Sequence, residues 1–257
     1  MIDPNNYKWN CINSNIDENL ISWCKTGNFL SLVRIYSNIN NPLIKNLLTF
    51  LVEPYINTDI VSKIVQEGFA FDPNINPSWF IYSNFNKTAE HIGINSNRIA
   101  RTKGHKSTGK WYVEIFINNA SFSSSLWPMV GILNETHYLN NFIGRDSANI
   151  GIGWQSFAGS TLRLWHDGNK FTYVHDFKTN DIVMIAFDCD TGDVWFGKNG
   201  VWNTGDPPLG TPCHTETEMI GVEMYVAILQ HINQIMTIRP SASEFTYSIP
   251  TGFSALQ

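Results

Sequence analysis

The stretch NDIVMIAFDCDTGDVWFGKNG, residues 180–200, decides the fold. Residues 182–187 are apolar on both faces, which is typical of a strand buried between two layers. Aspartates and a glycine fill residues 188–193, where an Asp side chain can bond to its own backbone and Gly accepts positive φ. Residues 194–196 return as a second strand, and Asn199-Gly200 signals another tight turn. The stretch therefore predicts a β-hairpin with a structural role.

Similar strand patterns lie on both sides of this hairpin. They occupy residues 110–117, 129–133, 149–154, 161–165, 170–174, 224–228 and 234–238. Short strands with turn signals between them, and no helix-length pattern among them, are typical of an antiparallel sandwich. The predicted fold class is mainly β, with two antiparallel sheets and a small N-terminal α-helical segment.

The first sixty-odd residues have a different pattern. Apolar residues recur at helical spacing in four short stretches, residues 16–24, 29–36, 43–51 and 60–65. Each stretch is shorter than the roughly 12–15 residues at which an isolated helix becomes marginal, so its apolar face must be buried. Two hypotheses remain open: a helical cap on the β domain, or a docking module that buries these faces on a partner. We predict a helical attachment segment and linker at 1–77 and a β-sandwich at 78–257.

Composition limits the class of protein. The chain has 257 residues, of which 43% are hydrophobic and 15% charged, as in a globular protein. Its formal net charge of -5 gives no overall attraction to nucleic acid or to an anionic membrane. No apolar run reaches membrane-spanning length, and the N-terminus lacks the pattern of a signal peptide. We expect a soluble protein made in a cytoplasm, without a nucleic-acid partner, membrane insertion or cofactor.

Several segments, taken in order, resemble a SPRY domain, a concanavalin-like β-sandwich. They read STGKWYVEIFI, MVGIL, FIGRDSANIGIGW and TNDIVMIAFDCDTGDVWFGKNGVW. The ending IRPSASEFTYSIPTGFSAL is similar to the version found in bacteriophage virion proteins. The resemblance covers residues 78–257. Two departures are the bulky segment ILQHINQIM and the long acidic loop NTGDPPLGTPCHTETE.

The resemblance implies binding rather than catalysis, through loops at one edge of the sandwich, although a fold alone does not fix a function. The leading hypothesis is a non-enzymatic phage virion structural protein, made in the host cytoplasm. Its N-terminal helices would attach to other virion proteins, and its β domain would meet a host surface protein or glycan. A homo-oligomer is compatible with this hypothesis. Two alternatives are a cytoplasmic SPRY adaptor for protein–protein interaction and a carbohydrate-binding sandwich.

Candidate binding residues are aromatic, cationic and amide side chains at expected strand ends or turns. Aromatic residues on loops of a rigid scaffold are common anchors of recognition. The alternative for each residue is a packing role, in which its side chain fills an end of the sandwich. The candidates are Tyr138, Arg145, Trp154, Arg163, Trp165, His166, Trp202 and Asn203.

No catalytic or metal-binding residues are predicted. The chain has no G-x-S-x-G, and the aspartates at 188, 190 and 193 lack the spacing of a calcium loop, so they are interpreted as turn formers. The seven histidines are scattered, without the close pairing of a zinc site. The four cysteines contain no C-x-x-C pair and are expected to be free thiols. Basic residues cluster at 98–110, as a solvated hairpin face or as an anion contact.

Overall fold

The computed structural model describes residues 66–257, except for 94–95, 121–126, 157–161 and 174–175. Gln66–Gln257 forms one compact unit. The helices predicted for residues 16–65 lie outside the described residues. Among those described, the helices are short 3-10 turns, and none is long and apolar enough to cross a membrane.

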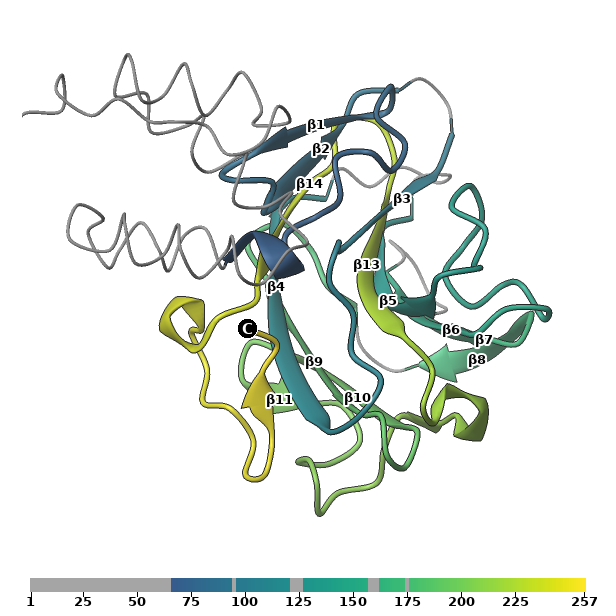
Figure 1. The fold of residues 1–257 in the computed structure, drawn as a ribbon, viewed down its shortest axis with the longest axis vertical. Coiled ribbons are helices and arrows are strands. Elements are labelled where there is room, and N and C mark those ends of the chain that lie inside the picture. Colours follow the sequence, from purple (N-terminus) through teal and green to yellow (C-terminus); the bar gives the residue numbers. More distant parts are fainter. Residues whose placement is uncertain (1–65, 94–95, 121–126, 157–161, 174–175) are drawn as a thin grey trace, which may run out of the picture. The chain divides into compact units, whose positions relative to one another are not determined.

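Nine of the described strands form one sheet. β12 (His214–Thr215) pairs with β10 (Asp193–Lys198), and β15 (Ser254–Ala255) pairs in parallel with β4 (Lys110–Asn119). The other seven follow one another across the sheet as β1 (Phe80–Ser83), β2 (Thr88–His91), β14 (Ile235–Arg239), β4 (Lys110–Asn119), β9 (Ile182–Asp188), β10 (Asp193–Lys198) and β11 (Val201–Trp202). Figure 1 shows that β14, near the end of the chain, lies between strands from its first half.

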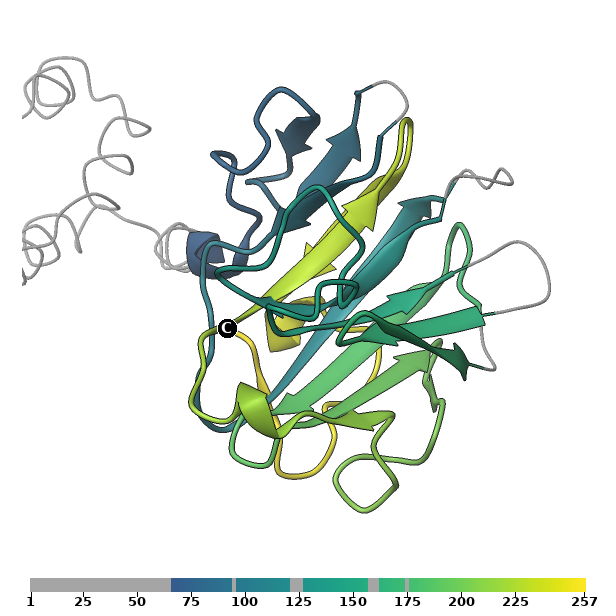
Figure 2. The same ribbon diagram turned by 90° about the vertical axis from the view of Figure 1, so that its right-hand side faces the viewer.

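The other described strands form a six-stranded antiparallel sheet. Their order is β3 (Arg98–Arg101), β13 (Met224–Gln230), β5 (Met129–Asn134), β6 (Gly151–Gln155), β7 (Leu162–His166) and β8 (Asn169–Tyr173). In Figures 1 and 2 the colours of these strands range from blue to yellow-green, because the strands come from segments that are far apart in the sequence. The prediction of a mainly β, two-sheet antiparallel sandwich is confirmed.

The core lies between the two sheets, as the alternation along the strands requires. In β9, Val183, Ile185 and Phe187 are fully buried and belong to the largest cluster of core residues. Ile132 of β5 and Trp154 of β6 belong to the same cluster from the opposite sheet. This apolar layer makes the sandwich a rigid scaffold for its loops.

The outer face of the nine-stranded sheet is covered by the C-terminal segment. Phe253 packs with Tyr112 and Met184, which point away from the main core. Glu114 of β4 is also fully buried there, and its carboxylate accepts hydrogen bonds from the backbone N–H groups of Thr246 (2.9 Å) and Tyr247 (2.8 Å). Because a buried carboxylate needs such donors, these bonds hold the chain ending against β4, and in Figure 1 the yellow C-terminal segment lies beside this strand.

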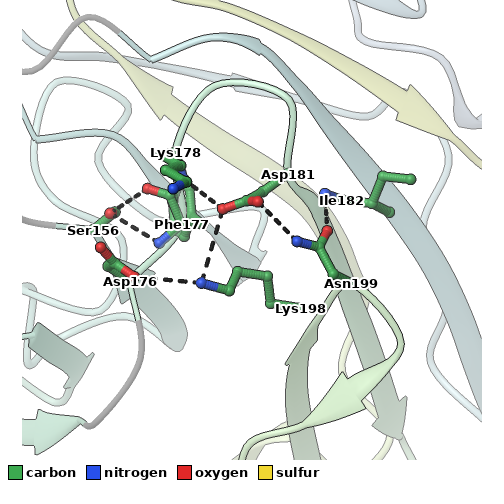
Figure 3. Close-up of polar contacts among 8 residues, drawn as sticks. All are labelled: Ser156, Asp176, Phe177, Lys178, Asp181, Ile182, Lys198 and Asn199. Carbon is green, nitrogen blue, oxygen red and sulfur yellow. Dashed lines mark hydrogen bonds and ion pairs between the residues drawn. The ribbon is translucent and has the colours of Figure 1, made fainter.

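The two turns of the central hairpin follow the sequence prediction. Gly192 has φ of 81°, and Asn199 and Gly200 have φ of 51° and 84°. The Asn199 amide donates to Asp181 (2.8 Å) and accepts from the N–H of Ile182 (2.9 Å), as Figure 3 shows. This turn is therefore fixed to the start of β9.

The same end of the sandwich holds a second set of polar contacts, which joins both sheets (Figure 3). The Ser156 hydroxyl, just after β6, donates to the carbonyl of Phe177 (2.6 Å) and accepts from its N–H (3.1 Å). Lys198 lies 3.3 Å from the Asp176 carboxylate. At the Asn199 end of the hairpin, the loop that precedes β9 is therefore bonded both to β10 and to the end of β6.

Residues before the predicted boundary at 78 pack with the sandwich. Phe71 is 1% exposed, belongs to the main core and forms an isolated bridge with Thr102. The short helix η2 (Gln66–Phe69) precedes it, with Phe69 packed against the core. The β unit therefore includes residues 66–77, which the sequence assigned to the attachment segment and linker.

Candidate functional site

An aromatic stack lies on the outer face of the six-stranded sheet. The Phe142 ring, in the loop between β5 and β6, lies between the Trp127 ring at 6.1 Å and the Trp165 ring at 5.6 Å, both inclined by 27°. Trp165 projects from β7 on this side because Leu164, its neighbour, points into the core. Trp127 and Phe142 remain partly exposed.

Two guanidinium groups flank the stack. Arg145 Cζ lies 5.4 Å from the centre of the Phe142 ring, and Arg163 Cζ lies 5.9 Å from that of Trp127. Cations within about 6 Å of an aromatic ring are attracted to it. Arg145 is exposed and Arg163 is partly exposed. We call these five residues, Trp127, Phe142, Arg145, Arg163 and Trp165, the Phe142 surface.

Hydrogen bonds hold this surface in place. The Trp165 indole N–H donates to Gln155 Oε1 (2.8 Å) on the neighbouring strand. Gly144 has φ of 80°, and a Cβ there would lie 2.2 Å from the Trp165 carbonyl oxygen, so only glycine allows the loop to approach so closely. The loop is therefore fixed against β7.

His137 organises the same loop from within. Its ring is buried, and Nε2 accepts the N–H of Gly144 (3.1 Å) while Nδ1 lies 3.0 Å from the Tyr138 carbonyl. Burial lowers the pKa of His137, although the Tyr138 carbonyl and Asp146 oppose this effect. The neutral tautomer with the proton on Nδ1 satisfies both contacts. Tyr138, the next residue, is 59% exposed.

The predicted candidates do not form one surface. Arg145 and Trp165 contact Phe142, Arg163 lies over Trp127 of the same stack, and Tyr138 belongs to the same β5–β6 loop as Phe142. Trp202 packs instead on the outer face of the nine-stranded sheet, 6.2 Å from the Tyr112 ring. Asn203 follows it there, partly exposed. The expected single site is thus divided between the two sheets.

Trp154 was predicted as a binding residue at a strand end; it lies one residue from the end of β6, but its side chain is buried in the core. It is 0% exposed, in β6, and stands opposite Val130 of β5, whose side chain also belongs to the core. Its ring meets the Phe177 ring edge-on at 5.2 Å. Cross-strand pairing places Trp154 on the inner face, so it cannot touch a ligand on the outer one.

His166 lies on the other side of β7 from Trp165. Its imidazole meets His214 of β12 and Glu216, which immediately follows that strand. Burial lowers the pKa of His214, the neighbouring His166 lowers it further, and Glu216 opposes both. The sequence excluded a metal site because the histidines are scattered, yet folding brings these two together.

The charged groups singled out in the sequence are engaged within the domain. Asp188 Oδ1 accepts the N–H of Asp190 (2.9 Å), and Asp190 accepts that of Gly109 (2.9 Å), as expected for turn formers. In the basic cluster, Arg98 lies over Trp79 (4.1 Å) and Arg101 over Tyr225 (4.2 Å). These two guanidinium groups are therefore engaged with aromatic rings of the domain, whereas Lys103 of the same cluster is exposed.

Trp127 and Phe142 were not predicted as site residues. Phe142 belongs to FIGRD, where an aromatic residue stands three positions before Arg145. This combination of an aromatic and a cationic residue is the sequence feature from which Phe142 could have been predicted as a site residue. Trp127 follows residues 121–126, in which no strand pattern was present.

Comparisons with known proteins agree with the architecture. No family model matches the chain, and no curated protein does. Among solved structures, the PSpry domain of TRIM65 superposes with a TM-score of 0.51 at 15% identity, covering 66% of this chain and 90% of that chain. The fold is SPRY-like. The SPRY domain of human HERC1 has a TM-score of 0.47 at 18% identity, with coverages of 66% and 96%. At these identities the likeness concerns the fold alone, and the phage type of SPRY domain stays a prediction.

Proposed function

We propose that the SPRY-like domain is a protein-binding module without catalytic activity, and that the Phe142 surface is its contact site. The observation that carries the proposal is the stack of Trp127, Phe142 and Trp165, flanked by the guanidinium groups of Arg145 and Arg163. Tryptophan and arginine are enriched among the residues that contribute most to protein interfaces.

Rigidity supports the proposal. Trp165 is fixed by Gln155 and by its strand, and the Phe142 loop is fixed by His137 and Gly144. A partner that binds such a surface meets side chains that are already ordered, so less conformational entropy is lost on association. Loops that present aromatic groups from a rigid scaffold are common recognition sites.

The chemistry of the surface indicates the kind of partner. Arginine presents a planar fork of N–H donors that matches carboxylates and carbonyl oxygens, and aromatic faces accept apolar side chains. We expect a peptide segment in which an acidic residue lies beside a large apolar one. The chain as a whole carries a net charge of -5, so attraction of an acidic partner would be local to this surface.

A selection experiment tests the proposal. A library of random linear peptides is screened against the full chain, and an enriched peptide is titrated against the wild type and against Phe142→Ala, Arg145→Ala and Arg163→Ala. Removing an anchor should weaken binding by about tenfold or more. Lys103→Ala is the matched control, since it removes an exposed cation on another part of the domain. Thermal unfolding of each variant checks that the fold is kept.

Four results would contradict the proposal. Binding that is unchanged in all three variants would move the contact site elsewhere, and binding lost only on Trp202→Ala would move it to the other sheet. Absence of any enriched peptide, combined with binding on a glycan array, would favour the carbohydrate-binding alternative. Turnover of a bound peptide or glycan would refute the absence of catalysis.

The virion role is a finer hypothesis and stays a prediction. Its support is the order of the sequence segments and the ending IRPSASEFTYSIPTGFSAL. Under this hypothesis the module is carried on the phage particle and its partner is on the host; under the adaptor alternative, both are cytoplasmic. Mass spectrometry of purified particles separates the two, because absence of the chain from the particle would remove the virion role.

A further inference from the structure

A cluster of two imidazoles and one carboxylate joins the two sheets at one edge. His166 ends β7 in the six-stranded sheet, and His214 lies in β12, which pairs with β10 in the nine-stranded sheet. His214 stands opposite Val194, a core residue, and His166 lies on the same side of β7 as Leu164, another core residue. The two histidines therefore face each other from different sheets.

The donor atoms of the cluster are close together. Glu216 Oε2 lies 2.7 Å from His166 Nε2 and 3.9 Å from His214 Nε2, and the two imidazole centroids are 4.1 Å apart. One ligand atom from each of the three residues lies within 4.8 Å of the others. The side chains are mostly buried, with 18%, 20% and 9% exposed for His166, His214 and Glu216.

Hydrogen bonds within the described residues leave this arrangement incomplete. Glu216 Oε1 accepts the N–H of Glu218 (2.8 Å), so Oε2 is the oxygen that faces the histidines. The Nε2 atom of His166 lies 2.7 Å from this oxygen, but the buried Nε2 of His214 makes no hydrogen bond with the described residues. A single proton can bridge only two of these three atoms, one as the hydrogen-bond donor and the other as the acceptor. A small cation can bind all three, because both imidazole nitrogens and the carboxylate oxygen can donate a lone pair to it.

We propose that His166, His214 and Glu216 bind a divalent transition-metal ion, and that Zn²⁺ is the ion that this donor set fits best. Imidazole and carboxylate are zinc ligands, whereas Mg²⁺ and Ca²⁺ prefer all-oxygen sites. Zinc bonds of about 2.0–2.1 Å in a tetrahedron place neighbouring ligand atoms roughly 3.4 Å apart. The two distances from Glu216 Oε2, 2.7 and 3.9 Å, fall on either side of this value, and all three ligand atoms lie within 4.8 Å of one another, so binding of the ion requires the side chains to shift.

Three protein ligands leave a fourth position for water or for a donor atom of a partner. The ion connects β7 to β12, and hence one sheet to the other, at an edge where β8 also contributes the exposed ring of Phe171, 6.2 Å from that of His214. Binding to the folded state alone stabilises it by mass action. The site is independent of the Phe142 surface, because His166 and Trp165 point to opposite sides of β7.

Calorimetric titration of the full chain with ZnCl₂, after chelator treatment, tests the proposal. We expect about one equivalent bound at this site, with higher thermal stability in Zn²⁺ and no such effect from Mg²⁺ or Ca²⁺. His166→Asn and His214→Asn should each weaken the affinity by roughly 100-fold or more, since loss of an outer-shell partner alone costs 10–100-fold. Glu216→Gln should also weaken it, while its remaining amide oxygen still accepts the Glu218 N–H.

The matched control is His105→Asn. His105 and Glu223 form another His–Glu pair, at 3.2 Å, but both are exposed and the pair lacks a second histidine. This variant should keep the wild-type affinity for Zn²⁺. Near-UV circular dichroism establishes that each variant is folded before it is titrated.

Cobalt provides a second measurement, which needs no variant. Co²⁺ bound to the wild type should give the visible bands of a tetrahedral or five-coordinate site without absorption from cobalt–thiolate bonds. Thiolate absorption would assign the ion to cysteines and overturn the proposal. Failure of the wild type to bind Zn²⁺, or equal binding by folded His214→Asn and wild type, would also overturn it.

Discussion

Trp154 fills the centre of the sandwich, where its indole meets Phe177 edge-on and is closed off from solvent. Trp165, in the next strand, stands opposite Gly153 and turns outward to stack on Phe142. The difference arises from strand register, because neighbouring residues in a strand point to opposite faces. At the scale of single residues, the same side chain thus supports the core at one position and the proposed contact site at another.

Replacement of Trp154 tests its assignment to the core. We expect Trp154→Ala to lower the free energy of unfolding by about 3–5 kcal/mol, since it removes a fully buried aromatic ring. Tyr138→Ala should change it by less than about 0.5 kcal/mol, because Tyr138 is exposed. Urea unfolding measures both, and equal effects of the two substitutions would contradict this assignment.

The contribution of Asp188 to the stability of the fold depends on pH. Burial acts to raise its pKa, but hydrogen bonds from Lys110, Asp190 and Thr191 outweigh burial and hold the pKa below the usual value for Asp. The Lys110 Nζ lies 3.0 Å from its carboxylate. A lowered folded-state pKa means that the stabilisation is present above the unfolded pKa, about 3.9, and is lost as the pH falls through the folded value.

Asp188→Asn should therefore destabilise the protein at pH 7, by about 1.5–3 kcal/mol, and by progressively less as the pH falls below about 4. Chemical unfolding at a series of pH values measures the difference between the variant and the wild type. A difference that stays constant down to pH 3 would mean that the charge of Asp188 contributes nothing to folding.

At the scale of elements, the β9–β10 hairpin is held at both turns by its own polar side chains. The Asp188 turn is closed by carboxylate-to-backbone bonds, and the Asn199 turn by contacts with Asp181 and the N–H of Ile182. These bonds fix the register of β9 and β10, and β4 pairs with β9 along nearly its whole length. The hairpin thus sets the positions of the central strands of its sheet.

Two substitutions at one position separate the contributions of Asn199. Asn199→Gly keeps the positive φ but removes the amide, so we expect a loss of about 1–2 kcal/mol. Asn199→Ala also places a Cβ in a left-handed conformation, which adds about 1–2 kcal/mol. In thermal or urea unfolding, we expect stability to decrease from the wild type to the Gly variant and then to the Ala variant. Equal stability of the Gly and Ala variants would exclude a contribution from backbone conformation.

At the scale of the whole molecule, the β unit begins before the sequence resemblance does. Phe71 is buried in the core and bridges to Thr102. We expect a fragment of residues 66–257 to be soluble and to unfold cooperatively. A fragment of residues 78–257 should be less stable by about 3–5 kcal/mol, because it lacks the Phe71 ring. Equal unfolding midpoints of the two fragments in urea would refute this role of Phe71.

Most of the sandwich was predictable from sequence, since β4 alternates along its length and β9 is a continuous apolar run bounded by turn residues. β1, β2 and β3 were not predicted, because four-residue segments such as TAEH and RIAR show too little alternation. The candidate site was predicted only in part. Which face Trp154 occupies depends on register, and the meeting of His166 with His214 depends on the pairing of β12 with β10, neither of which a local pattern contains.

The most direct test of the proposed contact site observes the tryptophan indoles during binding. The full chain is labelled with ¹⁵N at its nine tryptophans, the indole signals are assigned by substitution, and a selected peptide is added. The account predicts that the signals of Trp127 and Trp165 shift, while that of the buried Trp154 stays in place. Shifts confined to Trp202, with Trp127 and Trp165 unchanged, would contradict it.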